Sequence, residues 1–156
     1  MAIDKVREHL KKWGREKDIL KFDISSATVE LAAQALSCEP ARIAKTLSFK
    51  TPNNAIVVVS AGDARTDNKK YKNEFGVKAR MISREDVLDF IGHDIGGVCP
   101  FALNKGVHVF LDISLKRYET VFPACGSSNS AIELTCDELA EYSGYDKWVD
   151  VCKDWQ

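Results

Sequence analysis

The spacing of apolar residues along the sequence predicts a mixture of helices and strands. Apolar side chains recur at helical spacing over residues 3–13 and Gly14 follows, so the sequence predicts a helix that ends near this glycine. Residues 25–28 (SSAT) can cap an alanine- and leucine-rich helix that runs through Leu36. Pro40 then opens a turn or a short helix.

Several stretches have the composition or the alternation of β-strands. These stretches are 19–24, 44–50, 55–60, 77–82, 107–113, 121–124 and 131–134. Turn residues at 51–54 (TPNN) separate the second stretch from the third, so these two are expected to form a hairpin.

Further helices are expected between the strands. Residues 67–75 are polar and lysine-rich, whereas 83–86 and 135–138 each resemble a capping box. The first box would open a helix to Ile91 and the second would open the final helix. Helices and strands mix without a regular βαβ repeat, so the prediction is a single α+β domain over residues 1–156, built on a mixed, mainly antiparallel sheet.

The composition is that of a globular protein and excludes several other classes. The formal net charge is −1, which excludes a broadly basic nucleic-acid coat protein, and neither DNA nor a membrane is an expected partner. The charged N-terminal segment does not resemble a signal peptide, and the five scattered cysteines are typical of reduced thiols, so a cytoplasmic protein is predicted. No residue spacing indicates a metal site, and no cofactor is expected.

One stretch, residues 65–80, is strongly basic, whereas acidic residues dominate from Glu133 onward. Lys69, Lys70 and Lys72 lie in its predicted helix. They form either a solvated helix face or a small phosphate-contacting patch that would bind RNA with salt-sensitive affinity. The sequence leaves both alternatives open.

Residues 96–101 (GGVCPF) are the most informative segment for function. Paired glycines let the backbone approach a ligand closely and adopt positive φ, and the proline stiffens the exit. The loop joins a predicted helix to a strand, and functional residues often lie on such loops. We therefore expect ligand contacts, mainly through backbone groups, at Gly96, Gly97, Val98, Cys99 and Pro100.

Lys45 and Cys99 are the candidate reactive side chains. Lys45 shares its strand parity with Leu47 and Phe49, so it either reaches a cleft or extends to solvent. Cys99 could act as a nucleophile only with a base, for which His93 is the nearby candidate; otherwise it is a small thiol that fills the loop. The sequence has no Walker loop, nucleophile elbow or zinc-deaminase motif, so an enzyme of this kind would work by positioning and electrostatics.

Taken together, several motifs resemble a known family. They are residues 44–47 (AKTL), Asp63 after Ala61-Gly62, the loop from Gly96 to Pro100, and Gly126 followed by 132–135 (IELT). In that order and spacing they are similar to the YbaK / prolyl-tRNA-synthetase-associated editing domain family, from about Leu20 to Ser143. The protein resembles the free-standing members, because no synthetase modules are attached.

The resemblance implies a barrel-like sheet core with surrounding helices and an aminoacyl-tRNA deacylase that acts in trans. Such an enzyme hydrolyses the ester between a wrong amino acid and the 3′-terminal adenosine of a tRNA, here tRNA-Pro carrying a small residue such as cysteine or alanine. Lys45 would take the family's essential lysine role and anchor the terminal nucleotide or the carbonyl. The segment 96–100 and Gly126 would line the aminoacyl pocket, and a ribose hydroxyl of the substrate would assist. The implied partners are the mischarged tRNA and a prolyl-tRNA synthetase.

The sequence departs from the family at positions that bear on specificity. Alanine-specific members resemble one another in a histidine near the last glycine loop, where this protein has Cys125-Gly126-Ser127. Cysteine-specific members often have tyrosine and aspartate near the positions of Phe122 and Ala131. The edited amino acid therefore stays open. The alternative function is a non-catalytic module of the same fold that binds a tRNA end or a partner.

Overall fold

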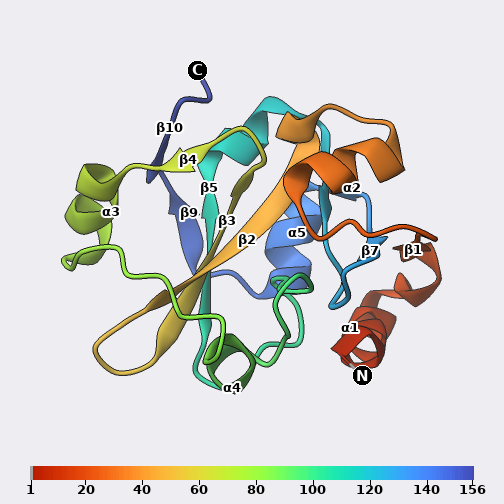
Figure 1. The fold of residues 1–156 in the computed structure, drawn as a ribbon, viewed down its shortest axis with the longest axis horizontal. Helices are drawn as coiled ribbons and strands as arrows, with labels where there is room; N and C mark the ends of the chain where they lie inside the picture. Colours follow the sequence, from red (N-terminus) through yellow and green to blue (C-terminus); the bar gives the residue numbers. More distant parts are fainter. Residues whose placement is uncertain (1) are drawn as a thin grey trace.

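The structure, a computed structural model, describes residues 2–156 as one curled mixed sheet with helices packed around it (Figure 1). Six strands lie in the order β8-β6-β2-β3-β5-β9. Their bounds are β2 (Ile43–Lys50), β3 (Ala55–Ala61), β5 (His108–Asp112), β6 (Thr120–Pro123), β8 (Leu134–Thr135) and β9 (Lys147–Val149). The β2–β3 and β6–β8 neighbours are antiparallel, and the other neighbours in this sheet are parallel. The predicted α+β class with a mixed sheet is confirmed.

Two pairs of short strands lie outside this sheet, and both pairs are antiparallel. β1 (Leu20–Lys21) pairs with β7 (Ser130–Ala131), and β4 (Arg65–Thr66) pairs with β10 (Cys152–Lys153). The prediction of a single strand at 131–134 is therefore wrong. It is divided between β7 and β8, because these two short strands pair with different partners, β1 and β6.

The helices cover the sheet and its edges (Figure 1). They are α1 (Ala2–Leu10), α2 (Val29–Leu36), α3 (Asn68–Phe75), α4 (Val87–Ile91) and α5 (Cys136–Ser143), with short 3-10 turns at Lys11–Trp13, Glu16–Asp18, Pro40–Arg42 and Ile113–Arg117. The Thr28 hydroxyl caps α2, and Thr135 with Glu138 forms the predicted capping box of α5. Within residues 2–156, no helix has the length and apolar character needed to cross a membrane.

Residues 77–82 do not form the predicted strand. They meet β2 only at an isolated bridge between Phe49 and Met81 and through sparse hydrogen bonds, including one from the Ile82 N–H to the Ser48 carbonyl. Exposed and half-buried residues alternate along most of this segment, because one of its sides is covered. The alternation does not reflect continuous hydrogen bonding to a neighbouring strand. Beyond Ile82 the segment turns away from β2, so part of the β2 edge has no neighbouring strand among residues 2–156.

The capping box predicted at 83–86 does not open a helix either. Its Ser83 hydroxyl donates to the Asp86 carboxylate at 3.0 Å, and this carboxylate caps no N–H group. The helix α4 therefore begins only at Val87. The two side chains bond to each other, and the turn that they form delays the helix.

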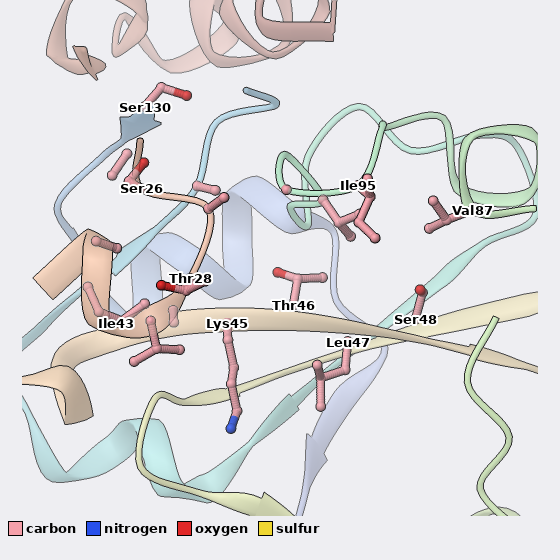
Figure 2. Close-up of a pocket in the computed structure, with 18 of the residues that line it drawn as sticks. Ser26, Thr28, Ile43, Lys45, Thr46, Leu47, Ser48, Val87, Ile95 and Ser130 are labelled. Carbon is pink, nitrogen blue, oxygen red and sulfur yellow. The ribbon is translucent and has the colours of Figure 1, made fainter. Parts of the chain in front are cut away.

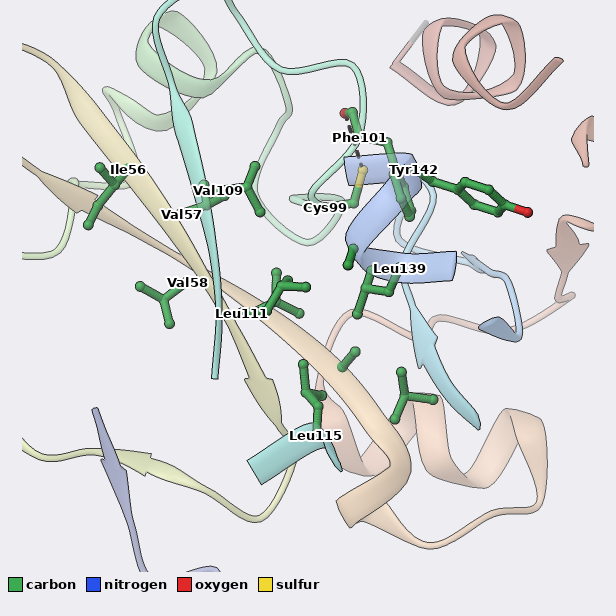
Figure 3. Close-up of a cluster of buried hydrophobic side chains, with 14 of the residues drawn as sticks. Ile56, Val57, Val58, Cys99, Phe101, Val109, Leu111, Leu115, Leu139 and Tyr142 are labelled. Carbon is green, nitrogen blue, oxygen red and sulfur yellow. Dashed lines mark hydrogen bonds between the residues drawn. The ribbon is translucent and has the colours of Figure 1, made fainter. Parts of the chain in front are cut away.

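The main core lies where β3 and β5 pack against α5 (Figure 3). β3 is buried at every residue, and Leu111, Leu115 and Leu139 are 0% exposed. Each buried leucine contributes roughly 1.5–3 kcal/mol to stability. Phe101, at the end of the glycine-containing loop, is also 0% exposed and belongs to this core. The core therefore anchors one end of that loop.

Candidate active site

A cavity of about 390 Å³ lies along β2, where the pairing with β6 stops (Figure 2). A cavity of this size suits a small ligand or the end of a larger one. Its walls come from residues 26–32, β2, 81–87, 95–98 and 122–131. The lining includes Lys45 on β2 together with Gly96 and Val98 on the glycine loop. The fold thus joins the two segments that the sequence singled out.

The described residues of the cavity wall include no side chain suited to general acid–base catalysis at neutral pH. Among the described residues that line it, Lys45 and Arg84 are the ionisable ones, and none is Asp, Glu, His or Cys. Apolar side chains such as Ile43, Val98 and Phe122 form much of the rest. Within residues 2–156 no cluster of His, Cys, Asp and Glu is arranged to hold a metal ion. Chemistry here would depend on positioning, on cations and backbone dipoles, and on groups of the ligand.

Lys45 lies at the cavity wall on the face of β2 opposite to Thr46 (Figure 2). It shares this face with Leu47, as strand alternation predicts. The Lys45 ammonium donates a hydrogen bond to the backbone carbonyl of Ala64. Burial lowers the pKa of this lysine below its ordinary value. Lys45 is thus a half-buried cation with a neutral partner, which differs from the solvent-extended alternative.

Asp63 supports the turn that carries the Lys45 partner. Its carboxylate accepts two hydrogen bonds from the Arg117 guanidinium, at 2.5 Å and 3.0 Å. These bonds hold the pKa of Asp63 below its ordinary value. The Ala64 N–H closes the turn by donating to the Ala61 carbonyl at 3.0 Å. Asp63 is therefore occupied by an ion pair and is not free to act as a general base.

The glycines near the cavity have different roles. Gly96, at φ +87°, lines the cavity together with Val98. Gly97 instead packs against the second glycine loop, since a Cβ there would lie 2.8 Å from both atoms of the Gly126 carbonyl group. Gly126 in turn lies against α1, where a Cβ would be 2.9 Å from the Ala2 carbonyl oxygen. Gly97 and Gly126 bring the two loops together and are not among the described residues that line this cavity, so their contact with a substrate stays a prediction.

Cys99 and His93 do meet, but inside the core. The Cys99 Sγ lies 3.4 Å from the His93 Nε2, and both side chains are 0% exposed. The same Nε2 lies 2.6 Å from the Phe101 carbonyl oxygen, which accepts a hydrogen bond from it, so this nitrogen carries the proton and is not free to act as a base. Burial raises the pKa of Cys99 to about 12 and lowers the pKa of His93. Cys99 is therefore a buried thiol and not an activated nucleophile.

Two loop residues predicted to contact a ligand lie away from this cavity. Cys99 is in the core, and Pro100 lines a separate hollow beside His9 and Asn104. The backbone turns inward after Val98, because Phe101 is drawn into the core. Of the five loop residues singled out in the sequence, the structure places only Gly96 and Val98 at the cavity.

Several polar residues on the wall, among them Thr46, Ser48 and Arg84, were not predicted as site residues from the sequence. The Thr46 hydroxyl is buried and has no hydrogen-bond partner among the described residues. Arg84 is exposed at the cavity, and its sequence context indicated only a capping box. Strand alternation could have placed Thr46 opposite Lys45, but no local signal shows that the edge of β2 is open there.

The predicted RNA-contacting lysines lie on α3, which is on one side of the sheet, whereas α2 borders the cavity on the other side (Figure 1). Lys69 and Lys72 are exposed. Lys70 donates from Nζ to the Asp150 carboxylate at 3.0 Å and to the Cys152 carbonyl at 3.2 Å. Lys70 therefore holds the C-terminal segment, and none of the three lysines lines the cavity.

The protein is similar to several known proteins. A family model described as an aminoacyl-tRNA editing domain matches residues 25–142. The sequence is 54% identical over 157 residues to the uncharacterized protein YwhH of Bacillus subtilis (strain 168), and the match spans 100% of both proteins. It is 29% identical over 90 residues to the proline–tRNA ligase of Bacillus pumilus (strain SAFR-032), a match that spans 57% of this protein and 16% of that enzyme. The structure also superimposes with a TM-score of 0.87 and 27% identity on a solved structure described as a candidate trans-editing enzyme for prolyl tRNA synthetase, and the superposition includes 97% of each protein.

Proposed function

Because the protein belongs to the aminoacyl-tRNA editing domain family, we propose that it is a deacylase that acts in trans on mischarged tRNA. In this reaction water adds to the ester carbonyl carbon and the bond from that carbon to the ribose oxygen breaks. The ribose oxygen takes up a proton, and a free amino acid and an uncharged tRNA result. Such editing is required because small side chains differ by only about 1–3 kcal/mol in a single binding step.

The observation that carries the proposal is a cavity whose described lining combines Lys45 of β2 with residues of the glycine loop and includes no protein base. Lys45 and the loop residues Gly96 and Val98 line the same space. An ester needs oriented donors for the charge that develops on its carbonyl oxygen, which a cation and backbone N–H groups supply. Since no carboxylate, imidazole or thiol belongs to the described wall, a ribose hydroxyl beside the ester would assist the attacking water.

Within this proposal, Lys45 anchors the terminal nucleotide or the ester carbonyl. Among residues 2–156 its ammonium donates one hydrogen bond, to the Ala64 carbonyl, and an ammonium carries three donors. Figure 2 shows the ammonium on the face of β2 away from Thr46, so the lysine would have to turn toward the open edge of β2 for its two other donors to reach a substrate in the cavity. Partial burial strengthens such a contact, because the local dielectric is lower than in water.

We further propose that the substrate is tRNA-Pro carrying a small amino acid such as cysteine or alanine, and that a prolyl-tRNA synthetase is a partner. The similarity to a segment of a proline–tRNA ligase supports the choice of tRNA. Of the positions that depart from the family pattern, Phe122 and Ala131 line the cavity, whereas Cys125 is 0% exposed. Phe122 and Ala131 are thus the positions through which the preference for an amino acid would be set.

A panel of mischarged tRNAs tests the function directly. tRNA-Pro and a second tRNA, each charged with alanine, cysteine, serine or proline, are incubated with micromolar protein, and the remaining ester is measured over time. Faster loss than in buffer for at least one mischarged species is expected, with cognate prolyl-tRNA-Pro spared. Loss at the buffer rate for every member would reject the deacylase and leave the non-catalytic binding module.

Replacement of Cys99 by alanine is expected to leave deacylation within about 2-fold of the wild type, because the thiol is buried and its pKa is raised to about 12. The variant should lose about 1 kcal/mol of stability through the small cavity that it creates. Single-turnover deacylation and thermal unfolding measure the two effects. Abolished activity in a folded Cys99→Ala protein would instead support a cysteine-dependent hydrolase.

The exposed lysines of α3 give a separate prediction about tRNA binding. If Lys69 and Lys72 contact the acceptor stem, the Lys69→Gln/Lys72→Gln protein should bind tRNA more weakly, and the slope of log K against log salt should become shallower by up to about 2. Lys70 is left unchanged because it holds Asp150. Filter binding from low to moderate salt measures the slope. An unchanged slope would show that this helix face is only solvated.

A further inference from the structure

We infer that Thr46 binds the aminoacyl group of the substrate through its backbone and its hydroxyl, so that the enzyme requires a free α-amino group. The inference rests on the proposed function and adds to it the chemical feature of the ester that the cavity recognises.

The backbone groups of Thr46 lie on a part of the β2 edge that has no neighbouring strand. On this edge β2 pairs with β6 only through Ile43 and Ala44. Two residues beyond Thr46, the Ser48 carbonyl accepts the Ile82 N–H. Thr46 therefore lies in the gap between these two pairings.

Strand geometry determines which way the Thr46 backbone points. Ser48 and Lys50 use their backbone groups on the edge away from β3, since the Lys50 N–H donates to the Arg80 carbonyl at 2.7 Å. In an antiparallel pair this direction alternates with a period of two residues. The Thr46 N–H and C=O must point to the same open edge, where the pairing with β6 ends at Ala44 and the contacts with residues 80–82 begin only at Ser48.

The Thr46 side chain adds a third polar group to the cavity. It lies on the face of β2 opposite to Lys45 (Figure 2). Its Oγ1 is buried without a hydrogen-bond partner among residues 2–156. A buried hydroxyl without a partner is costly, and in a cavity wall a ligand can satisfy it. Thr46 thus has a backbone donor and a carbonyl acceptor on the open edge of β2 and a buried hydroxyl in the cavity wall.

An aminoacyl ester matches this set of groups. Its α-ammonium can donate to the Thr46 carbonyl and hydroxyl oxygens, and its ester carbonyl can accept from the Thr46 N–H. Two residues that form a hydrogen-bonded pair in an antiparallel sheet make the same two backbone hydrogen bonds. The amino acid would therefore extend the sheet by one residue. No carboxylate belongs to the described cavity wall, so an ammonium there depends on neutral oxygens of this kind.

N-acetylation of the substrate tests the inference on the unmodified protein. Alanyl- and cysteinyl-tRNA-Pro are compared with the same tRNAs after acetylation of the α-amino group. Acetylation removes the charge and two donors, and we expect it to lower kcat/KM at least ~10-fold, the scale of one charge-assisted hydrogen bond. Equal hydrolysis of free and acetylated substrates would overturn the inference and leave the deacylase proposal intact. Hydrolysis of neither substrate would reject both.

Variants at Thr46 test whether the requirement for a free α-amino group depends on this residue. Thr46→Val keeps the shape and removes the hydroxyl, so it should reduce kcat/KM about 10-fold for the free substrate and much less for the acetylated one, whereas Thr46→Ser should retain activity. Thr66→Val, on β4 and outside the cavity lining, is the matched control and should behave as the wild type. An equal loss on both substrates, or no loss, would overturn the assignment to the hydroxyl. If Thr46→Val does not fold, the acetylation experiment still decides the requirement.

Discussion

Replacement of Lys45 by alanine is expected to slow deacylation at least ~100-fold, which is the scale of losing one electrostatic contact to a reacting centre. No carboxylate, imidazole or thiol among the described residues of the cavity wall could compensate. The ammonium is half-buried and donates to the Ala64 carbonyl, so its loss should lower stability by only about 1 kcal/mol. Single-turnover hydrolysis of the best substrate of the panel measures the rate, and thermal unfolding measures the stability.

Two controls make the Lys45 result interpretable. Lys105→Ala removes an exposed lysine that does not line the cavity and should deacylate as the wild type does. Binding of uncharged tRNA by Lys45→Ala distinguishes the two proposed roles of the lysine. If Lys45 anchors the terminal nucleotide, the variant should bind this tRNA more weakly. If Lys45 contacts only the ester carbonyl, binding should be unchanged. Near-full activity of a folded Lys45→Ala protein would refute the proposed role of the lysine.

Replacement of Gly97 by alanine should impair both stability and activity. The added Cβ would lie 2.8 Å from both atoms of the Gly126 carbonyl group and 3.0 Å from the Ser127 nitrogen. These are backbone atoms that cannot rotate away, so the two loops must separate at a cost of about 1–3 kcal/mol. Gly96 and Val98 would then move with respect to Lys45, and a displacement of about 1 Å can lower a rate about 100-fold.

A second glycine variant distinguishes the effect of backbone strain from the effect of moving the glycine loop. Gly76 ends α3 at φ +77° and has no atom within 4 Å of an added Cβ. Gly76→Ala should therefore lose about 1–2 kcal/mol through backbone strain and keep its deacylation rate. Chemical denaturation and single-turnover rates are compared for the two variants. Wild-type activity in folded Gly97→Ala protein would contradict the role assigned to the loop contact.

Local chemistry in the sequence determined most helix boundaries. Thr28 and Asp67 accept the first N–H groups of their helices, and Gly14 and Gly76 end theirs with positive φ. Such ends are predictable because the groups involved lie within one helical turn of each other. The capping box predicted at 83–86 was wrong because its two side chains bond to each other. There the Ser83 hydroxyl donates to the Asp86 carboxylate, and the Asp86 side chain caps none of the described helix N–H groups.

Longer-range pairing was only partly predictable. The hairpin of β2 and β3 follows from the turn at 51–54, whereas the short strands β4, β9 and β10 were missed because two or three residues carry no periodicity. Residues 77–82 alternate as a strand does, yet they meet β2 at a single bridge. An alternating pattern shows that one side of a segment is covered and does not show what covers it.

The sequence by itself determined the family resemblance, the α+β class, and the face of β2 on which Lys45 lies, because these depend on local order and on strand parity. Only the tertiary structure decided which atoms reach the cavity. It placed Gly96 and Val98 on the wall, drew Cys99 into the core, and left the edge of β2 open at Thr46. These outcomes depend on packing between segments far apart in the sequence, such as Gly97 against Gly126, and no local pattern encodes such contacts.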